Sequence, residues 1–334
     1  MFASLRNRFE ISPHRYAQVT TIALIGLALI VFSGAAVRLT DSGLGCPDWP
    51  QCYGAGPHPA LESHAIIESS NRIITGLLGV AVIAACILAF FRRPYRRHLA
   101  IFGALLPLGV IAQAILGALV VKYDLKPELV MGHFILSMML LDAGFALFWC
   151  SRYEPWDRRR SWDRKGVWAV RCLVPLGQLT ILAGTVATGS GPHAGEFEGQ
   201  FVKRFTFKGH DTLEWVVQRH AVFAAIYGFA AIGVWFYLRR RGGDRRAVKP
   251  LTVVLFLLLL QGVVGYVQWE LELPSEIVWV HVALATCNWL AMLWTIAAAG
   301  RLEPRAGTLA DGERRDTPTD RSASATAGAS AGAV

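Results

Sequence analysis

Two histidines of this chain, His133 and His281, occupy equivalent positions in an internal sequence repeat. The segment 113–134 (QAILGALVVKYDLKPELVMGHF) aligns without a gap with 261–282 (QGVVGYVQWELELPSEIVWVHV), 148 residues further on. Self-similarity on this scale indicates a duplicated structural unit. Both histidines lie inside apolar stretches, where an ionisable side chain is costly unless it binds something. The repeat therefore predicts two related binding sites, one in each copy.

A third histidine, His220, lies in the segment EWVVQRHAVF, about as far into its apolar stretch as His281 is into its own. The two side chains are therefore expected at the same depth on neighbouring helices. Two imidazoles at matched depth on facing helices are what a b-type haem needs for axial ligation. A lone membrane histidine can instead hydrogen-bond to a neighbouring helix, but that interpretation does not explain a repeat-related set. We therefore predict an iron-binding pair in the second copy.

The first copy departs from this plan, because Asn71 stands where His220 stands in the second. An amide is a poor iron ligand compared with imidazole, so His133 is expected to bind an iron from one side only. Glu68 lies one turn before Asn71 on the same helix face, and both are expected to point toward a ligand of His133. A carboxylate within a membrane span is a functional candidate. The alternative is that Glu68 only pairs with Arg72, one turn further on.

Two cysteines, Cys46 and Cys52, lie in the Gly- and Pro-rich segment GLGCPDWPQCYG between the first two apolar stretches. In an oxidising compartment such a pair is expected to form a disulfide. The spacing does not separate a structural disulfide from a redox-active one. His64 precedes Glu68 by one helical turn, and it is either a solvated side chain or a direct participant in the site.

The composition places these residues in a membrane. Of the 334 residues, 54% are apolar, and the mean hydropathy of +0.40 excludes an ordinary soluble domain. Eight stretches reach the roughly 20 residues needed to span a bilayer, near residues 18–37, 66–90, 99–121, 128–149, 171–189, 214–238, 250–268 and 277–299. The predicted fold class is an all-α polytopic membrane protein with eight transmembrane helices. An even number of spans per copy gives two four-helix bundles that are parallel repeats.

The basic residues indicate the orientation. Most of the 33 Lys and Arg lie in the N-terminus, in the turns 92–97, 152–171 and 239–249, and after residue 301. By the positive-inside rule both termini are cytoplasmic, which predicts a multi-pass protein of the cell membrane. The net charge of +9 is then explained by topology and by contact with the lipid bilayer, so no nucleic-acid partner is expected.

The same patterns divide the chain into five segments. Residues 1–17 are the cytoplasmic N-terminus, and residues 18–150 are the N-terminal four-helix bundle with the His133 site and the outer-loop cysteines. A cytoplasmic linker, 151–170, leads to the C-terminal four-helix bundle, 171–300, with the paired histidines. The tail 301–334 is too poor in bulky apolar residues to fold, and we expect it to be disordered in the cytoplasm.

The string GAAVRLTDSGLGCPDWPQC, the IIESSNR segment and the later histidines resemble the haem A synthase family, over residues 18–300. The resemblance implies an eight-helix enzyme that oxidises the C8 methyl of haem O to a formyl group by successive hydroxylations, giving haem A for terminal oxidase assembly. It implies a resident haem b on His220 and His281. It also implies haem O as the substrate in the first bundle, with Glu68 as the catalytic carboxylate and His133 as the axial histidine.

Three further implications follow from the resemblance. Cys46 and Cys52 match the outer-loop cysteine pair of the family. Many members have histidine where this chain has Asn71, so the substrate haem is expected on His133 alone or with help from His64. A haem O synthase is implied as a partner, whereas the sequence does not indicate the electron donor.

Two other classes of protein share some of these features. A b-type electron-transfer protein would bind haem in both copies and would need a ligand pair in each, whereas the sequence offers a clear pair only in the second copy. A transporter can also be built from parallel repeats, but polar residues would then lie near mid-membrane. Here the polar candidates cluster toward the outer leaflet, which favours the synthase.

Overall fold

The computed structural model describes residues 10–46, 52, 63–154, 163–195, 202–241 and 243–300. Eight of the helices in this part of the chain are long and apolar enough to cross a membrane, which confirms the eight predicted spans. They are α2 (Pro13–Leu39), α3 (Ser63–Phe91), α4 (Arg97–Lys122), α5 (Pro127–Arg152), α6 (Arg164–Ser190), α7 (Thr212–Arg240), α8 (Val248–Glu270) and α9 (Ser275–Ala298). A short 3₁₀ helix, η1 (Gly209–Asp211), precedes α7. The predicted tail lies outside the described residues.

Two helices, α2 and α6, begin several residues before the predicted apolar stretches, and a polar side chain caps the N-terminus of each. α2 begins at Pro13, where the Ser12 side chain accepts a hydrogen bond from the Arg15 N–H and where proline suits the first turn. α6 begins directly after Asp163, whose carboxylate accepts from the Gly166 N–H at 3.0 Å. Within the spans, a helix satisfies every backbone group internally, as the absence of water from a bilayer core requires.

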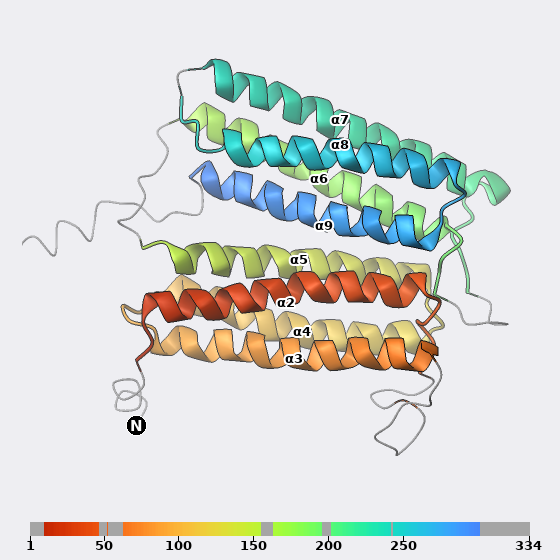
Figure 1. Cartoon of the computed structure of the whole chain (residues 1–334), viewed down its shortest axis with the longest axis horizontal. Helices are drawn as coiled ribbons and strands as arrows, with labels where there is room; N and C mark the ends of the chain where they lie inside the picture. Colours follow the sequence, from red (N-terminus) through yellow and green to blue (C-terminus); the bar gives the residue numbers. More distant parts are fainter. Residues whose placement is uncertain are drawn as a thin grey trace, which may run out of the picture.

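The helices form two sets of four that follow the order of the chain (Figure 1). In each set neighbouring helices pack along their length, and the main contacts between the sets join α2 to α9 and α5 to both α6 and α9. Trp279 of α9 donates its indole N–H to the Phe32 carbonyl of α2 at 2.9 Å. Trp289, further along α9, donates to the Asp142 carboxylate of α5 at 2.7 Å. Polar as well as apolar contacts thus hold the two sets together.

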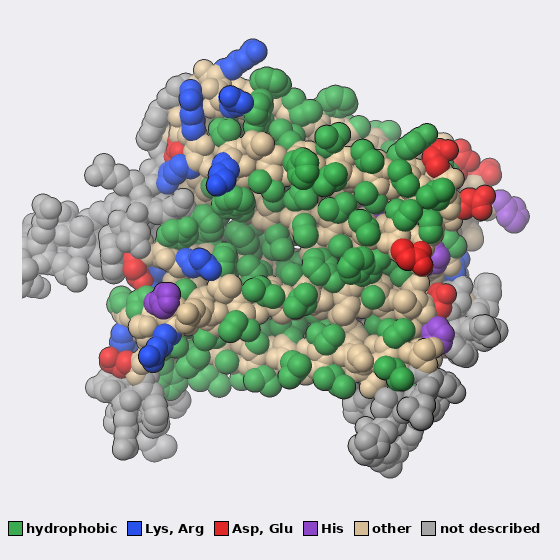
Figure 2. Space-filling view, in the orientation of Figure 1, with side chains coloured by type: hydrophobic (Ala, Val, Ile, Leu, Met, Phe, Trp, Pro, Cys, Tyr) green, Lys and Arg blue, Asp and Glu red, His purple; other side chains and the backbone are tan. Residues whose placement is uncertain are grey.

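The two ends of the molecule differ in charge (Figure 2). Lys and Arg side chains gather at the end where α3 meets α4 and α7 meets α8, which we call the basic end. Several Asp, Glu and His side chains lie at the opposite end, which we call the loop end; it carries the segments 40–46, 191–195 and 202–211. Between the two ends the visible surface is mostly apolar. This distribution is the one expected for a bundle that crosses a bilayer.

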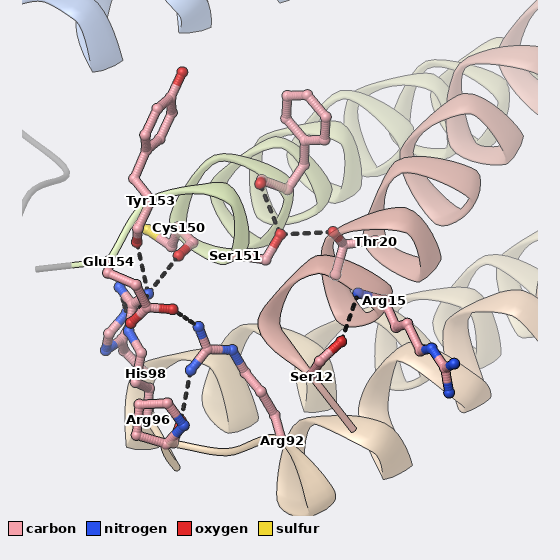
Figure 3. Close-up of polar contacts among 12 residues, drawn as sticks. Ser12, Arg15, Thr20, Arg92, Arg96, His98, Cys150, Ser151, Tyr153 and Glu154 are labelled. Atoms are coloured by element: carbon pink, nitrogen blue, oxygen red, sulfur yellow. Dashed lines mark hydrogen bonds and ion pairs between the residues drawn. The ribbon is translucent and has the colours of Figure 1, made fainter. Parts of the chain in front are cut away.

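A buried polar cluster joins three helices at the basic end (Figure 3). Arg92, fully buried after the last residue of α3, forms an ion pair with Glu154. Arg96 donates to the Cys150 and Tyr153 carbonyls at 2.8 and 2.7 Å, so it satisfies backbone acceptors at the end of α5. Burial, followed by repulsion from Arg96, lowers the pKa of Arg92 to about 10, which leaves Arg92 charged at neutral pH.

Candidate functional site

The structure brings His220 of α7 and His281 of α9 together, toward the loop end of the second set of helices. Their ring centroids are 6.2 Å apart and their planes are inclined at 67°. Two imidazoles that bind one metal ion from opposite sides, each through a nitrogen at about 2.0–2.1 Å, have centroids roughly 6 Å apart. The pair is therefore spaced to bind one iron from both sides.

A hydrogen bond from one ring nitrogen of His220 leaves the other ring nitrogen available for metal binding. Nδ1 lies 3.0 Å from the Thr180 carbonyl of α6. A carbonyl can only accept, so Nδ1 carries the proton and Nε2 is left as the metal-binding atom. Metal-binding histidines are commonly oriented in this way by a backbone carbonyl. For His281, Nδ1 is buried and has no hydrogen-bond partner among the described residues.

Glycines on neighbouring helices make room for these rings. A Cβ added to Gly184 would lie 3.0 Å from Cε1 of His220, and one added to Gly265 would lie 3.2 Å from Cε1 of His281. Both separations are shorter than ordinary van der Waals contact. Each imidazole therefore packs directly on the backbone of the adjacent helix, which fixes the position of the ring.

The environment of His133 in the first set repeats that of His281. A Cβ added to Gly117, the repeat equivalent of Gly265, would lie 3.4 Å from Cε1 of His133. Nδ1 of His133 is buried without a hydrogen-bond partner, as is that of His281. The Gln113 amide donates to the His133 carbonyl at 3.0 Å. Repeat-related residues thus make like contacts, which supports the interpretation of the repeat as a duplicated site.

Glu68 is buried near the loop end of α3, and its two carboxylate oxygens have different partners. The Arg72 guanidinium donates to Oε1 at 2.6 Å, and the Cys46 N–H donates to Oε2 at 2.8 Å. The pairing with Arg72 is the alternative that the sequence left open, and it is present here. It does not exclude a chemical role, since the contact with Cys46 also ties Glu68 to the cysteine loop.

Two other candidate residues of the first set have partners outside α5. The Asn71 carbonyl oxygen accepts from the Ser33 hydroxyl of α2 at 2.7 Å. His64, in the first turn of α3, lies with Nδ1 3.1 Å from the Ser42 hydroxyl. Both therefore connect α3 to α2 and to the segment that follows it. A direct contact of either with a ligand of His133 stays a prediction.

The predicted disulfide between Cys46 and Cys52 is present, with Cα atoms 4.7 Å apart. The preceding residue, Gly45, explains how the loop approaches α3. A Cβ at Gly45 would lie 2.6 Å from the His64 carbonyl oxygen, a separation that no other residue type allows. The glycine thus lets the loop backbone lie on the first turn of α3 and brings the Cys46 N–H to Glu68.

Sequence reasoning missed two residues that join the halves. The Asp142 carboxylate, inside α5, accepts a hydrogen bond from the Trp289 indole N–H. In the sequence Asp142 is the one acidic residue of the apolar run SMMLLDAGFALF. An acidic residue in such a run is a candidate functional residue by its position. Arg38 donates to the Thr188 carbonyl at the end of α6, at 2.7 Å. Its position in the VRLT string gave no indication that it reaches the other half.

These features define a class of protein: a polytopic α-helical membrane protein with half-buried histidines toward one end of the helices. A family model described as cytochrome oxidase assembly protein (COX15-CtaA) matches residues 17–195, more than half of the chain. The chain therefore belongs to this family. The matched region includes Glu68, His133 and both loop cysteines, whereas His220 and His281 lie beyond it.

Curated relatives carry a more specific name. Proteins named Heme A synthase from Halalkalibacterium halodurans, Lysinibacillus sphaericus and Shewanella oneidensis are similar to this chain. The first is 36% identical over 124 residues, which cover 36% of this chain and 41% of the relative. The second is 31% identical over 122 residues, covering 36% and 40%, and the third is 32% identical over 144 residues, covering 38% and 43%. The chain thus matches about two fifths of the length of each relative.

Proposed function

We propose that this protein is a haem A synthase, which oxidises the C8 methyl of haem O to a formyl group and so provides haem A for terminal oxidases. The paired imidazoles of His220 and His281, 6.2 Å apart, carry the proposal together with the unpaired His133. Membership of the cytochrome oxidase assembly family and the relatives named Heme A synthase support it.

The proposal assigns different roles to the two halves, with boundaries at residues 18–150 and 171–300. In the second half His220 and His281 hold a haem b, which when bound supplies electron transfer, the chemistry suited to an iron with two protein ligands. Thr180 and the adjacent glycines orient the two rings. In the first half His133 binds the iron of the substrate, haem O, and leaves its opposite face to oxygen chemistry.

Glu68 is the proposed catalytic carboxylate. It lies at the loop end, where α3 meets the cysteine loop, and it is held by Arg72 and the Cys46 N–H. A carboxylate so fixed can take up a proton from the substrate or stabilise positive charge that develops at the methyl carbon. Asn71 and His64 are proposed to shape the same pocket, and the disulfide to hold the loop in place.

The proposed setting is the cell membrane, with both termini in the cytoplasm and the loop end outside. The basic end of the helices supports this orientation. A haem O synthase would supply the substrate, because haem O is apolar and its transfer through water is unfavourable.

The test replaces Glu68 and the histidines in a strain that makes haem O but has no other haem A synthase. Glu68→Gln keeps the shape of the side chain and removes its charge, and we expect haem A to fall at least 100-fold while haem b content is unchanged. His220→Ala is expected to lower haem b, and His133→Ala to lower bound haem O. Haems extracted from the purified protein are identified by mass.

Two results would contradict the proposal. Haem A formation at the native rate by Glu68→Gln would remove the catalytic role of the carboxylate. Full haem b content in His220→Ala would remove the division of roles between the two halves. Thr75→Ala is a matched control on α3, because the Thr75 hydroxyl donates only to the backbone of its own helix, at 2.9 Å; it should behave as the unmodified protein does.

A further inference from the structure

A pocket of about 540 Å³ opens at the loop end of the second set of helices. Its apolar walls include Leu213 at the start of α7, Trp269 at the end of α8 and Leu273 in the turn to α9. Arg204 and Glu272 supply a cation and an anion at its edge. A volume of this size accommodates a small organic molecule, and the mixed lining suits one that is largely apolar with a few polar groups.

The turn that borders this pocket is present in both halves of the repeat. Glu272 and Leu273 adopt left-handed backbone angles, with φ of 61° and 63°, and their repeat equivalents Asp124 and Leu125 do the same, with φ of 51° and 55°. Left-handed residues other than glycine cost of order 1–3 kcal/mol each. The same strained turn is therefore built in both halves.

The two turns differ in what covers them. Leu125 is only 5% exposed and packs against Ala194 and Val202, which come from the segments on either side of residues 196–201. Leu273, in contrast, lines the open pocket. The second half has thus kept the turn and left its surface accessible, which is the arrangement expected of a binding site.

We propose that this pocket binds a membrane-soluble hydroquinone and that the hydroquinone reduces the haem held by His220 and His281; the inference rests on the proposed function. The Trp269 indole offers a flat apolar face for the quinol ring. The Arg204 guanidinium can donate to one ring oxygen, and the Glu272 carboxylate can accept from the hydroxyl at the other. Exposed apolar side chains at the end of α8, including Tyr266 and Leu271, provide a surface for the apolar tail of the quinol.

The position of the pocket fits electron transfer to the paired histidines. Leu213 precedes His220 by seven residues on α7, so at 1.5 Å per residue the pocket lies roughly 10 Å from His220 along the helix axis. Leu273 lies in the turn just before α9, which carries His281. The pocket is therefore beyond the reach of an iron ligand but close enough for an electron to cross without an additional carrier.

The proposed step balances. Oxidation of one hydroquinone to the quinone breaks two O–H bonds and releases two protons and two electrons. A haem held by His220 and His281 would take up these two electrons one at a time and would pass each on to the substrate site. The protons leave through Glu272 and His210, which is exposed at the pocket edge. Hydroxylation of a methyl group by dioxygen consumes two electrons and two protons, so one quinol supplies the electrons for one hydroxylation.

The experiment uses purified holoprotein with its haem oxidised, kept without oxygen. Decylubiquinol is added and haem reduction is followed by absorbance, while binding of decylubiquinone is measured by calorimetry, a readout independent of activity. Trp269→Ala is expected to weaken quinone binding at least tenfold, and Glu272→Gln to slow haem reduction at least tenfold. The matched control is Asp124→Asn, at the repeat equivalent of Glu272, which should alter neither quantity. Reduction by dithionite should be the same in every variant.

The outcomes separate this inference from the proposed function. Equal quinone binding and equal reduction rates in Trp269→Ala and in the unmodified protein would overturn the quinol site. So would haem A formation by a protein that decylubiquinol does not reduce. If decylubiquinol reduces the haem through Trp269 and Glu272 but haem O is never converted, the proposed function fails and the quinol site stands.

Discussion

At the scale of single residues, the histidine sites depend on the absence of side chains as much as on their presence. Gly184, Gly265 and Gly117 each face a histidine ring across a helix contact. A glycine within a helix costs roughly 0.5–1 kcal/mol relative to alanine. Three such glycines opposite three histidines indicate that the position of the imidazole, rather than helix stability, determines the residue type at these points.

This interpretation predicts different effects for substitutions at two neighbouring glycines of α8. Gly265→Ala places a methyl group 3.2 Å from the His281 ring and should displace it, so we expect haem b content to fall several-fold. Gly262→Ala meets no atom within 4 Å and should leave haem b content unchanged. Haem b per protein, with the electron paramagnetic resonance signal of the iron, measures the effect. Equal haem content in the two variants would show that the glycine contact does not position His281.

The sequence predicted residues whose chemistry is unusual in a membrane, and it did so from their type together with their place in the repeat or in a motif. His133, His220, His281 and the cysteine pair were identified because each is costly or rare in its context. The partners were harder to predict, since a hydrogen bond such as that of His220 to the Thr180 carbonyl involves backbone that any residue supplies. Asp142 had the same signal as Glu68 but no repeat or motif to single it out.

At the scale of helices, the spans were predictable and their packing was not. A bilayer requires long apolar helices, so hydropathy alone located all eight. Their sides are apolar almost all round, however, because lipid and helix neighbours present similar surfaces. Nothing in the pattern therefore indicated that α2 and α5 would contact α9. Those contacts depend on single residues such as Trp279 and Trp289.

The buried cluster at the basic end gives a prediction about stability. Glu154→Gln leaves the fully buried Arg92 without its ion-pair partner, and removing one member of a buried pair typically costs about 3–5 kcal/mol. We expect a clear loss of thermal stability in detergent, measured by the temperature at which the protein aggregates. Glu10→Gln is the control, because its ion pair with Arg93 is largely exposed and such pairs contribute about 0–1 kcal/mol. Similar losses in both variants would mean that Arg92 does not depend on Glu154.

At the scale of the whole molecule, the two halves have similar construction but different surfaces. Each has a histidine against a glycine and a left-handed turn at the loop end. In the first half this turn is covered by residues that belong to the second, and Gly43 donates to the Gly195 carbonyl nearby at 3.2 Å. Arg38 and Thr188 make a further link. Residues of the second half therefore cover the loop end of the first half, whereas the loop end of the second half carries the open pocket.

The orientation of the whole molecule decides from which side a soluble reagent reaches that pocket. Two exposed positions at opposite ends test it: Glu276 at the loop end and Arg245 at the basic end. In intact cells a membrane-impermeant maleimide should label Glu276→Cys, whereas Arg245→Cys should react only after the membrane is opened. The positive-inside rule predicts this result because Lys and Arg gather at the basic end. The unmodified protein controls for its own cysteines, of which Cys172 and Cys287 are exposed along the helices. Labelling of Arg245→Cys in intact cells, with protection of Glu276→Cys, would place the loop end in the cytoplasm, and protons from the pocket would then be released inside the cell.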